Sequence, residues 1–137
     1  MPLLRILAIF LPLVLLTSKA FAQDDSVALS KEFMLQAELT LAETKAEDIA
    51  RDLMVTAANY DPNNLKANFE AGSLHLNTIG KDKAAEFFLR VYKRDPDYRF
   101  SIEYLIGRSY QYGMQFDKAI EYYNLYKKRL QAKPNYS

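Results

Sequence analysis

The sequence predicts an all-α protein made of stacked helix pairs, and three observations support this prediction. Apolar residues recur at helical spacing along most of the chain. No segment shows the strict alternation of polar and apolar residues that is typical of a half-buried strand. A pattern of small residues, aromatic residues and Asp-Pro pairs also repeats with a period of 34 to 35 residues, which is typical of a stacked helical array.

The central unit, residues 65–98, shows this pattern most clearly. It contains two amphipathic segments that are joined at Gly80 and ended by Asp95-Pro96-Asp97. Its features recur when the sequence is shifted by 35 residues forward or by 34 residues back. The forward pairs are Gly72 and Gly107, His75 and Tyr110, Asp82 and Asp117, Ala84 and Ala119, Phe88 and Tyr123, and Val91 and Tyr126. The backward pairs are Ala84 and Ala50, Phe88 and Met54, Val91 and Ala57, and Asp95-Pro96 and Asp61-Pro62.

These residues resemble the tetratricopeptide repeat (TPR) family, and three units fit: 31–64, 65–98 and 100–133. The family has a small residue at the eighth position, an alanine at position 20 and a proline at position 32. The matches are Gly72 and Gly107, then Ala50, Ala84 and Ala119, then Pro62 and Pro96. Glu38 and Gln131 depart from the pattern, and no unit has the family's tryptophan at position 4. The resemblance implies a right-handed stack of three helix-turn-helix repeats, in which the first helix of each unit lines a concave groove.

Residues 1–22 are predicted to form a signal peptide. Arg5 precedes an apolar run of 11 residues, Ile6–Leu16, and Ala20-Phe21-Ala22 matches an A-x-A cleavage site. A membrane anchor is the alternative, but it requires about 20 apolar residues. We therefore expect cleavage between Ala22 and Gln23, and export to the periplasm or to the outer membrane. The polar segment 23–30 is expected to be a flexible lead-in.

The first repeat is predicted to contain one helix over residues 30–41 and a second that follows Thr44 and continues through Ala57 to the Asp61-Pro62 stop. Apolar residues at helical spacing support the first helix, and a Thr44-Lys45-Ala46-Glu47 capping box is expected to start the second. Asp61-Pro62 should end the second helix, because proline lacks the amide proton that a helix needs.

Cap residues define the four remaining helices. We expect Asn64 to cap the third helix and Gly80 to end it in the left-handed C′ position. Asp82 is expected to cap the fourth helix, which Pro96 ends. The fifth helix should run over residues 100–112 with Gly113 as its C′ residue, and the sixth, capped by Asp117, over residues 118–131. Residues 134–137 are expected to form a tail.

Composition excludes several classes of function. The predicted leader carries two basic residues and no acidic one, so its removal changes the formal net charge from +1 to −1. A nucleic-acid partner is therefore not expected, because it requires a basic surface. The chain contains no cysteine, so it forms no disulfide and carries no lipid-modified cysteine. Stability must come from packing between neighbouring repeats.

No pattern of residues indicates catalysis. His75 is the only histidine, and it occupies a repeat position that usually packs inside the helix pair. The four glycines are too dispersed for a phosphate-binding loop, and no nucleophile motif is present. We therefore expect no catalytic residue, no metal and no cofactor.

The resemblance places the partner-binding surface on the first helix of each unit. Aromatic and arginine side chains on such a surface are the residue types that anchor partners. The predicted contact residues are Phe69, Tyr104, Arg108, Tyr112, Lys66 and Asn77. Some TPR proteins bind chaperone C-termini through a lysine and an asparagine in the first unit, but those positions are Leu35 and Leu39 here. A co-chaperone role is therefore disfavoured.

Charge changes along the repeats. The formal net charge is −4 for residues 31–64, +1 for residues 65–98 and +4 for residues 99–133. Complementarity to helix dipoles and solubility are one explanation for the basic end. The other is polarity in docking, by which an acidic partner or an anionic envelope polymer would approach the third unit.

The last predicted helix contains an apolar stripe. Ile120, Tyr123, Tyr126 and Leu130 recur along it, and Tyr122 and Leu125 widen the stripe. A terminal repeat normally has a polar outer face. We therefore predict an interface at Tyr122, Tyr126 and Leu130, covered by a second copy, by a partner or by a further domain.

The favoured function is a non-catalytic protein-interaction module of the periplasm or cell envelope, which docks a protein or peptide segment in a concave groove. One alternative is the N-terminal portion of a larger envelope protein, associated with the outer membrane and peptidoglycan, that serves as an assembly scaffold. Large envelope proteins in which TPRs precede a β-propeller and an outer-membrane-protein-A-like domain resemble this arrangement. A second alternative is an accessory subunit of an enzyme.

Overall fold

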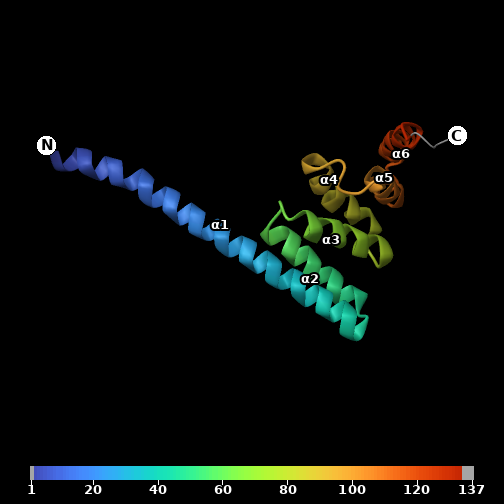
Figure 1. The fold of residues 1–137 in the computed structure, drawn as a ribbon, viewed down its shortest axis with the longest axis horizontal. Helices are drawn as coiled ribbons and strands as arrows, with labels where there is room; N and C mark the ends of the chain where they lie inside the picture. Colours follow the sequence, from blue (N-terminus) through green and yellow to red (C-terminus); the bar gives the residue numbers. More distant parts are fainter. Residues whose placement is uncertain (1, 134–137) are drawn as a thin grey trace.

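The computed structural model describes residues 2–133, and it describes side chains from Ala22 onward. This part of the chain contains helices and no strand, which confirms the all-α prediction. Figure 1 shows the order of the elements. They are α1 (Pro2–Thr44), α2 (Glu47–Tyr60), α3 (Leu65–Asn77), the 3₁₀ turn η1 (Lys81–Lys83), α4 (Ala84–Arg94), α5 (Ile102–Tyr112) and α6 (Phe116–Gln131).

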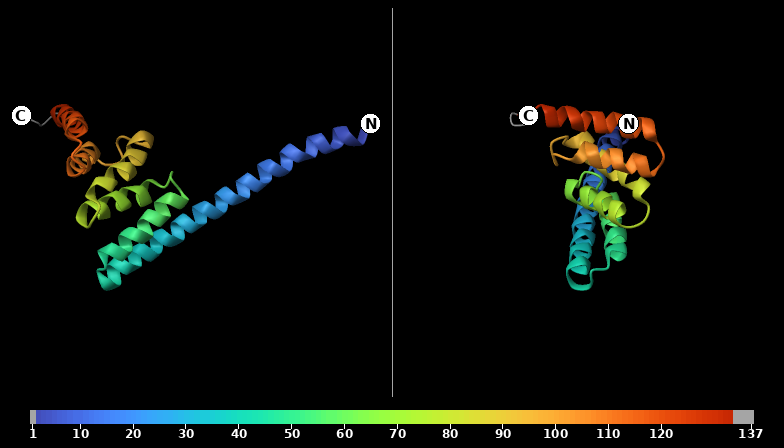
Figure 2. Two further views of the ribbon diagram at one scale, coloured as in Figure 1. Left: turned by 180° about the vertical axis from the view of Figure 1, so that it is seen from behind. Right: turned by 90° about the vertical axis from the view of Figure 1, so that its right-hand side faces the viewer.

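The helices form three antiparallel pairs that stack in sequence order. Each helix packs mainly against the helices that precede and follow it in the chain. The pair α1–α2 lies at one end of the stack and the pair α5–α6 at the other, while α1 extends far beyond its partner toward the N-terminus (Figures 1 and 2). Most of the predicted signal peptide lies outside the residues whose side chains are described. Among the fully described helices, none is long and apolar enough to span a membrane.

The core is divided between the junctions of the repeats, as expected for an array. One cluster joins the first and second units and the other joins the second and third. The first cluster is built around Ala37, Ala50, Met54, Ala57, Ala58, Ala67, Ala71, Leu74 and Phe87. The second is built around Leu76, Ala84, Phe88, Val91, Ile102 and Ile106.

Two glycines allow the helices of a pair to approach closely. A Cβ atom at Gly72 would lie 2.8 Å from the ring of Phe88, and one at Gly107 would lie 2.7 Å from the ring of Tyr123. Both distances are shorter than van der Waals contact, so a larger residue would displace the aromatic ring. This result explains why the glycine and the aromatic residue recur together in the sequence.

Several predicted helix ends are confirmed. The Asn64 side chain accepts a hydrogen bond from the Ala67 amide (3.0 Å) and caps α3. In both Asp-Pro turns the aspartate accepts a hydrogen bond from the amide two residues later, at 3.0 Å for Asp61 and 3.0 Å for Asp95. These contacts depend only on residues close in sequence, which is why the sequence predicts them.

The start of the first helix differs from the prediction. Residues 23–30 are helical and continuous with α1, so they do not form an irregular lead-in. The physical reason lies at Ser30, which is fully buried and accepts a hydrogen bond from the Asn64 side chain (3.1 Å). Packing against the turn between α2 and α3 therefore begins at Ser30, the first residue of the predicted helix, and the helix is continuous with residues 23–29.

Four predicted caps are wrong. Thr44 is the last residue of α1, and its hydroxyl contacts the Thr40 carbonyl and the Ala46 amide, so no capping box forms with Glu47. Neither Asp82 nor Asp117 caps a helix with its side chain, because α4 follows a 3₁₀ turn and α6 begins at Phe116. Gly113 is also not left-handed.

Each of the three repeats has one left-handed residue in the turn between its two helices. Gly80 has φ +67° as predicted, although it lies one residue beyond the C′ position. In the first and third repeats the left-handed residue lies one repeat position earlier, at Lys45 (φ +58°) and Met114 (φ +57°). Residues with a Cβ atom rarely adopt this conformation, so the first and third turns store backbone strain that the second avoids.

Candidate functional site

Exposed apolar side chains gather at the predicted groove positions of α1 and α5. Leu35 and Leu39 are exposed on α1, while Tyr104 (40%) and Tyr112 (49%) are exposed on α5. Isolated exposed apolar residues are ordinary, but several on equivalent faces of two repeats are typical of a binding surface. The first repeat therefore contributes leucines to this face, and the third contributes tyrosines.

On α5, Tyr104, Arg108 and Tyr112 form an aromatic–arginine ladder. Their spacing of four residues places them on one face of the helix. The guanidinium carbon of Arg108 lies 6.0 Å from the ring centre of Tyr104 and 5.9 Å from that of Tyr112. The two rings thereby hold Arg108 between them by cation–π attraction. The structure thus brings together three of the six predicted contact residues.

Lys81 extends the ladder from the preceding repeat. Its ammonium nitrogen lies 5.1 Å from the centre of the Tyr112 ring and donates to the Leu76 carbonyl (2.6 Å). Sequence reasoning missed this residue, because its approach to Tyr112 depends on how two repeats stack. The only sequence feature that points to Lys81 is its position in the turn of the second repeat, the repeat that precedes Tyr112.

The ladder carries positive charge that no described carboxylate neutralises. Within residues 22–133, no carboxylate oxygen lies within 4 Å of the Arg108 or Lys81 nitrogens. Interaction with the Arg108 guanidinium, and more weakly with Lys81, lowers the pKa of the Tyr112 hydroxyl. The surface therefore attracts anionic groups and presents two aromatic rings beside them.

The two tyrosines of the ladder differ in the contacts that they make outside it. The ring of Tyr104 also packs on α6, 5.8 Å from the ring of Tyr123 and 5.6 Å from that of Tyr126. Tyr112 makes no aromatic contact with the described core, since its neighbours are Arg108 and Lys81. Tyr112 is therefore the position at which binding can be separated from folding.

The remaining predicted contacts lie elsewhere. Phe69 is half-buried between Phe88 (5.6 Å) and Tyr98 (5.7 Å), and the Arg99 guanidinium covers its ring at 5.3 Å. Lys66 is exposed but forms an ion pair with Glu38 (2.6 Å), and Asn77 is the exposed last residue of α3. The structure therefore places Phe69 in the second core cluster, because residues of the following turn fold over it.

The predicted interface on α6 faces largely inward. The ring of Tyr122 lies 6.0 Å from that of Tyr92 and 5.8 Å from that of Tyr110, and burial raises its pKa. Tyr126 packs on Phe100 (5.8 Å) as well as on Tyr104, and Leu130 is half-buried. The register of α6 turns these residues toward α4 and α5, on the same side as the buried Ala119.

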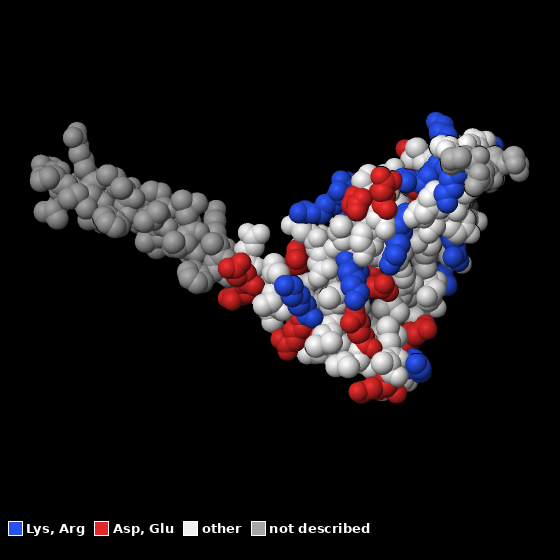
Figure 3. Space-filling model, in the orientation of Figure 1, with Lys and Arg blue, Asp and Glu red and all other residues white. Residues whose placement is uncertain are grey.

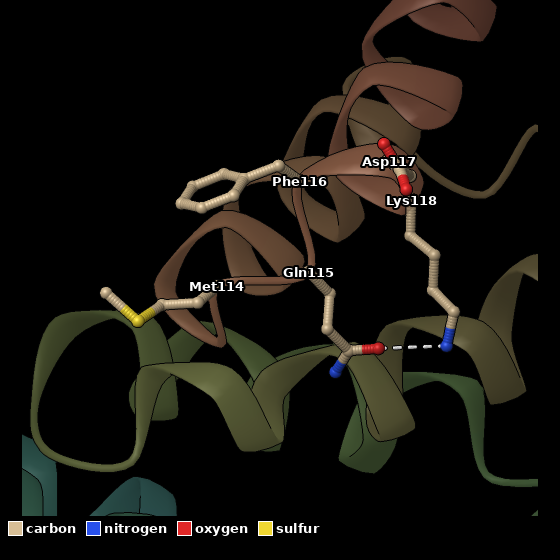
Figure 4. Close-up of a pocket in the computed structure, with 5 residues that line it drawn as sticks. All are labelled: Met114, Gln115, Phe116, Asp117 and Lys118. Atoms are coloured by element: carbon tan, nitrogen blue, oxygen red, sulfur yellow. Dashed lines mark hydrogen bonds between the residues drawn. The ribbon is translucent and has the colours of Figure 1, made fainter.

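The exposed apolar surface at this end of the stack is instead at the start of α6. Met114 is 77% exposed, and Phe116 and Ile120 are also exposed. Residues 114–118 line a shallow depression of about 360 Å³. Figure 4 shows Met114 and Phe116 pointing away from Gln115 and Lys118, which are joined by a 2.9 Å hydrogen bond. This arrangement presents apolar contact area without converging polar groups.

No arrangement typical of catalysis is seen in the described residues. His75 is buried, its ring stacks on Phe87 at 5.6 Å, and its Nδ1 atom lies 3.2 Å from the Ile79 carbonyl. Within residues 22–133, histidine and carboxylate side chains do not come together in groups of three that could hold a metal ion. The described contacts of His75 are those of a core residue.

Charge is graded in space as well as in sequence. On the face shown in Figure 3, most acidic side chains lie over α1 and α2, and most basic side chains lie toward α4–α6. The ladder belongs to the basic end, which adds long-range attraction to its local positive charge.

Comparison with known proteins supports the fold. No family model matches the sequence, and no curated protein matches it. A crystal structure of MamA is similar, with a TM-score of 0.59 at 16% identity over 74% of this chain and 58% of that chain. A point mutant of MamA is also similar, with a TM-score of 0.59 at 20% identity over 73% of this chain and 72% of that chain. The chain thus spans little more than half of the first MamA chain. At this level of identity the likeness shows the fold alone: an all-α, TPR-like stack of helix pairs.

Proposed function

We propose that this chain is a non-catalytic protein-interaction module that docks a partner segment against α5. The observation that carries the proposal is the aromatic–arginine ladder, in which Arg108 lies between two exposed tyrosines at 6.0 and 5.9 Å. Tyrosine and arginine dominate binding energy at protein interfaces. A TPR-like stack supplies a rigid, extended surface on which such residues can meet a peptide.

The partner segment is expected to carry carboxylates next to apolar or aromatic side chains. Arg108 and Lys81 attract the carboxylates, since neither is neutralised by a described side chain. The faces of Tyr104 and Tyr112 accept the apolar groups. The exposed leucines on α1 would then contact a further part of the same segment.

Site-specific photo-crosslinking tests this proposal. A photoreactive residue at position 112 should capture a defined partner, whereas the same residue at position 60 should not. Tyr60 is a matched control, because it is also an exposed tyrosine (42%) but lies at the end of α2, away from the ladder. Equal capture at both positions would contradict the proposal.

A substitution gives the quantitative form of the same test. Tyr112→Ala should weaken the captured complex at least about tenfold, the effect of removing an interface hot spot, while Tyr60→Ala should leave it intact. Circular dichroism should show the same helicity for both variants. Loss of helicity in Tyr112→Ala would assign this residue to folding instead.

We also propose that the module is exported. The basis is the predicted leader, residues 1–22. Intact mass of material recovered from the cell envelope should correspond to a chain that starts at Gln23. A protein that retains Met1 and stays in the cytoplasm would overturn this part of the proposal.

A further inference from the structure

Arginine side chains join successive repeats at equivalent positions. In the third repeat, Arg129 donates to Asp97 (2.5 Å) and donates twice to Glu103 (2.5 and 2.9 Å). Asp97 follows the Asp-Pro turn, and Glu103 is buried in α5. One residue of the last helix thereby holds both the preceding turn and its partner helix.

The second repeat makes the corresponding two contacts with two arginines and with neutral acceptors. Arg94, 35 residues before Arg129, donates to the Asn63 side chain. Arg90, one turn earlier, donates to the Asn68 side chain (3.3 Å). Asn63 corresponds to Asp97 and Asn68 corresponds to Glu103. Both carboxylates of the third repeat are therefore amides in the second, while the arginine is retained.

This exchange leaves positive charge without an internal partner. An amide oxygen accepts a hydrogen bond but carries no net charge, so Asn63 orients Arg94 without neutralising it. Arg90 forms an ion pair with Glu86 (2.5 Å). Among the described residues, no carboxylate oxygen lies within 4 Å of the Arg94 or Lys93 nitrogens.

These cations line a surface depression of about 330 Å³. Its lining residues are Pro62, Asn63, Arg90, Lys93 and Arg94, and none of them is acidic. The turn between α2 and α3 forms one wall and α4 forms the other. The depression therefore combines two guanidinium groups, an ammonium group and the space for a small ligand.

We propose that this depression binds a phosphate-type oxyanion. A guanidinium group presents several N–H donors in a plane and suits the oxygens of phosphate. Arg94 uses one nitrogen on Asn63, which fixes the side chain and leaves its other donors free. Arg90 is fixed by Asn59 (3.1 Å), by the Ala58 carbonyl (3.3 Å) and by its ion pair with Glu86, so the uncompensated positive charge comes from Arg94 and Lys93. Donors that are already oriented lose little freedom when they bind an anion.

The site is separate from the aromatic–arginine ladder. It lies on the second helix of its repeat, whereas the ladder lies on the first helix of the next. It also does not depend on a protein partner. A failure of one proposal therefore leaves the other intact.

Titration of the full chain with inorganic phosphate tests the proposal. Side-chain Nε–H resonances of arginine are followed by NMR, and sodium chloride holds the ionic strength constant so that screening does not change. The Arg94 and Arg90 resonances should shift and saturate. Phosphoserine is titrated in parallel. Tighter binding of inorganic phosphate would identify a free ion as the ligand, and tighter binding of phosphoserine would identify a phosphorylated group.

Three variants make the test specific. Lys93→Gln should lower phosphate affinity by about tenfold, the effect of losing one charged hydrogen bond. Lys128→Gln is the matched control, because Lys128 is the exposed lysine 35 residues later, and it should bind phosphate as the wild type does. Asn63→Asp introduces the carboxylate of the third repeat and should abolish binding while the fold is kept.

These measurements distinguish a specific phosphate site from non-specific association. Saturable shifts at Arg94 and Arg90 that are lost in Asn63→Asp and unchanged in Lys128→Gln support the site. Shifts that rise linearly with phosphate, or that are the same in all three variants, overturn it. Thermal unfolding of each variant without phosphate verifies that Asn63→Asp and Lys93→Gln are folded.

Discussion

The second and third repeats both use arginine side chains to contact the preceding turn and the partner helix, but the acceptors are neutral amides in the second repeat and carboxylates in the third. In the third repeat a buried carboxylate, Glu103, is neutralised by Arg129, whereas in the second repeat neutral asparagines hold Arg94 and Arg90. The geometry of the contact is kept while its electrostatics change. The comparison shows that arginine can donate across the junction between repeats to either a carboxylate or an amide. It also shows that the partner of the arginine decides whether the charge is confined inside the protein or remains available at the surface.

The largest expected effect comes from breaking the charged contact. Glu103 is only 2% exposed, and its Oε2 atom has no hydrogen-bond partner among the described residues. Removal of Arg129 leaves this carboxylate buried without compensation. We expect Arg129→Met to lower the free energy of unfolding by about 3 kcal/mol, measured by urea denaturation.

A double variant sharpens this result. Arg129→Met combined with Glu103→Gln removes the buried charge as well as its partner, so it should recover a large part of the lost stability. Equal instability of the single and double variants would mean that Arg129 acts through its packing instead of its charge.

The contact between Arg94 and the Asn63 amide should contribute less to the free energy of unfolding. Arg94 and Asn63 are both exposed, and Arg94→Met leaves no buried charge behind. The free energy of unfolding should fall by about 1 kcal/mol or less, because the hydrogen bond lost is exposed to solvent. A loss as large as that of Arg129→Met would show that the two contacts are energetically alike despite their different chemistry.

The turns offer a second comparison between repeats. Gly80 and Met114 both have positive φ angles, +67° and +57°. Gly80→Ala should destabilise the fold by about 1 kcal/mol, whereas Met114→Gly should stabilise it by about 0.5 kcal/mol, because only glycine adopts this conformation without strain. Differential scanning calorimetry should show a lower unfolding temperature for Gly80→Ala and a higher one for Met114→Gly than for the wild type. Destabilisation by Met114→Gly would instead show that the exposed methionine packs on a neighbour.

The sequence predicts local features of this fold well and features that depend on stacking poorly. The Asn64 cap and the two Asp-Pro turns form between residues at most three apart, so their chemistry can be read directly. The close contact of Gly72 with Phe88 is also predictable, because the two residues recur together in the next unit.

The candidate site shows the limit of this reasoning. Phe69 and Tyr104 occupy the same repeat position, yet Tyr98 and Arg99 fold over the first and leave it half-buried, whereas the second packs on α6 and remains 40% exposed. Lys81 reaches Tyr112 only because the second and third repeats stack. The exchange of carboxylates for amides is visible in the repeat alignment, but the direction of the arginine side chains is not. These features arise from contacts between units, which a single repeat does not encode.

The smallest expected effect distinguishes two groups of tyrosines. On the surface of α5, Arg108 and Lys81 lower the pKa of Tyr112, whereas burial raises the pKa of Tyr110, Tyr122 and Tyr123. Absorbance at the tyrosinate band during an alkaline titration should therefore show one tyrosine that ionises early. Tyr112→Phe should remove this early component, and Arg108→Gln should move it toward the normal pKa, since it removes the larger cause of the shift.

The sign of the accompanying stability change follows from linkage. The pKa of Tyr112 is lower in the folded state than in the unfolded state. As pH rises, the folded state therefore loses this proton at a lower pH than the unfolded state does. The stabilisation from Tyr112 is absent below the folded pKa, grows as pH rises between the folded and unfolded values, and is complete above the unfolded one. The half-buried Tyr110, Tyr122 and Tyr123 act in the opposite direction, because partial burial raises their pKa values and ionisation above pH 10 therefore destabilises the fold. Ionisation of these three tyrosines should therefore lower stability at alkaline pH, and Tyr112→Phe should make that loss slightly steeper. A shallower loss in Tyr112→Phe would mean that Arg108 and Lys81 do not hold the Tyr112 ring in the ladder.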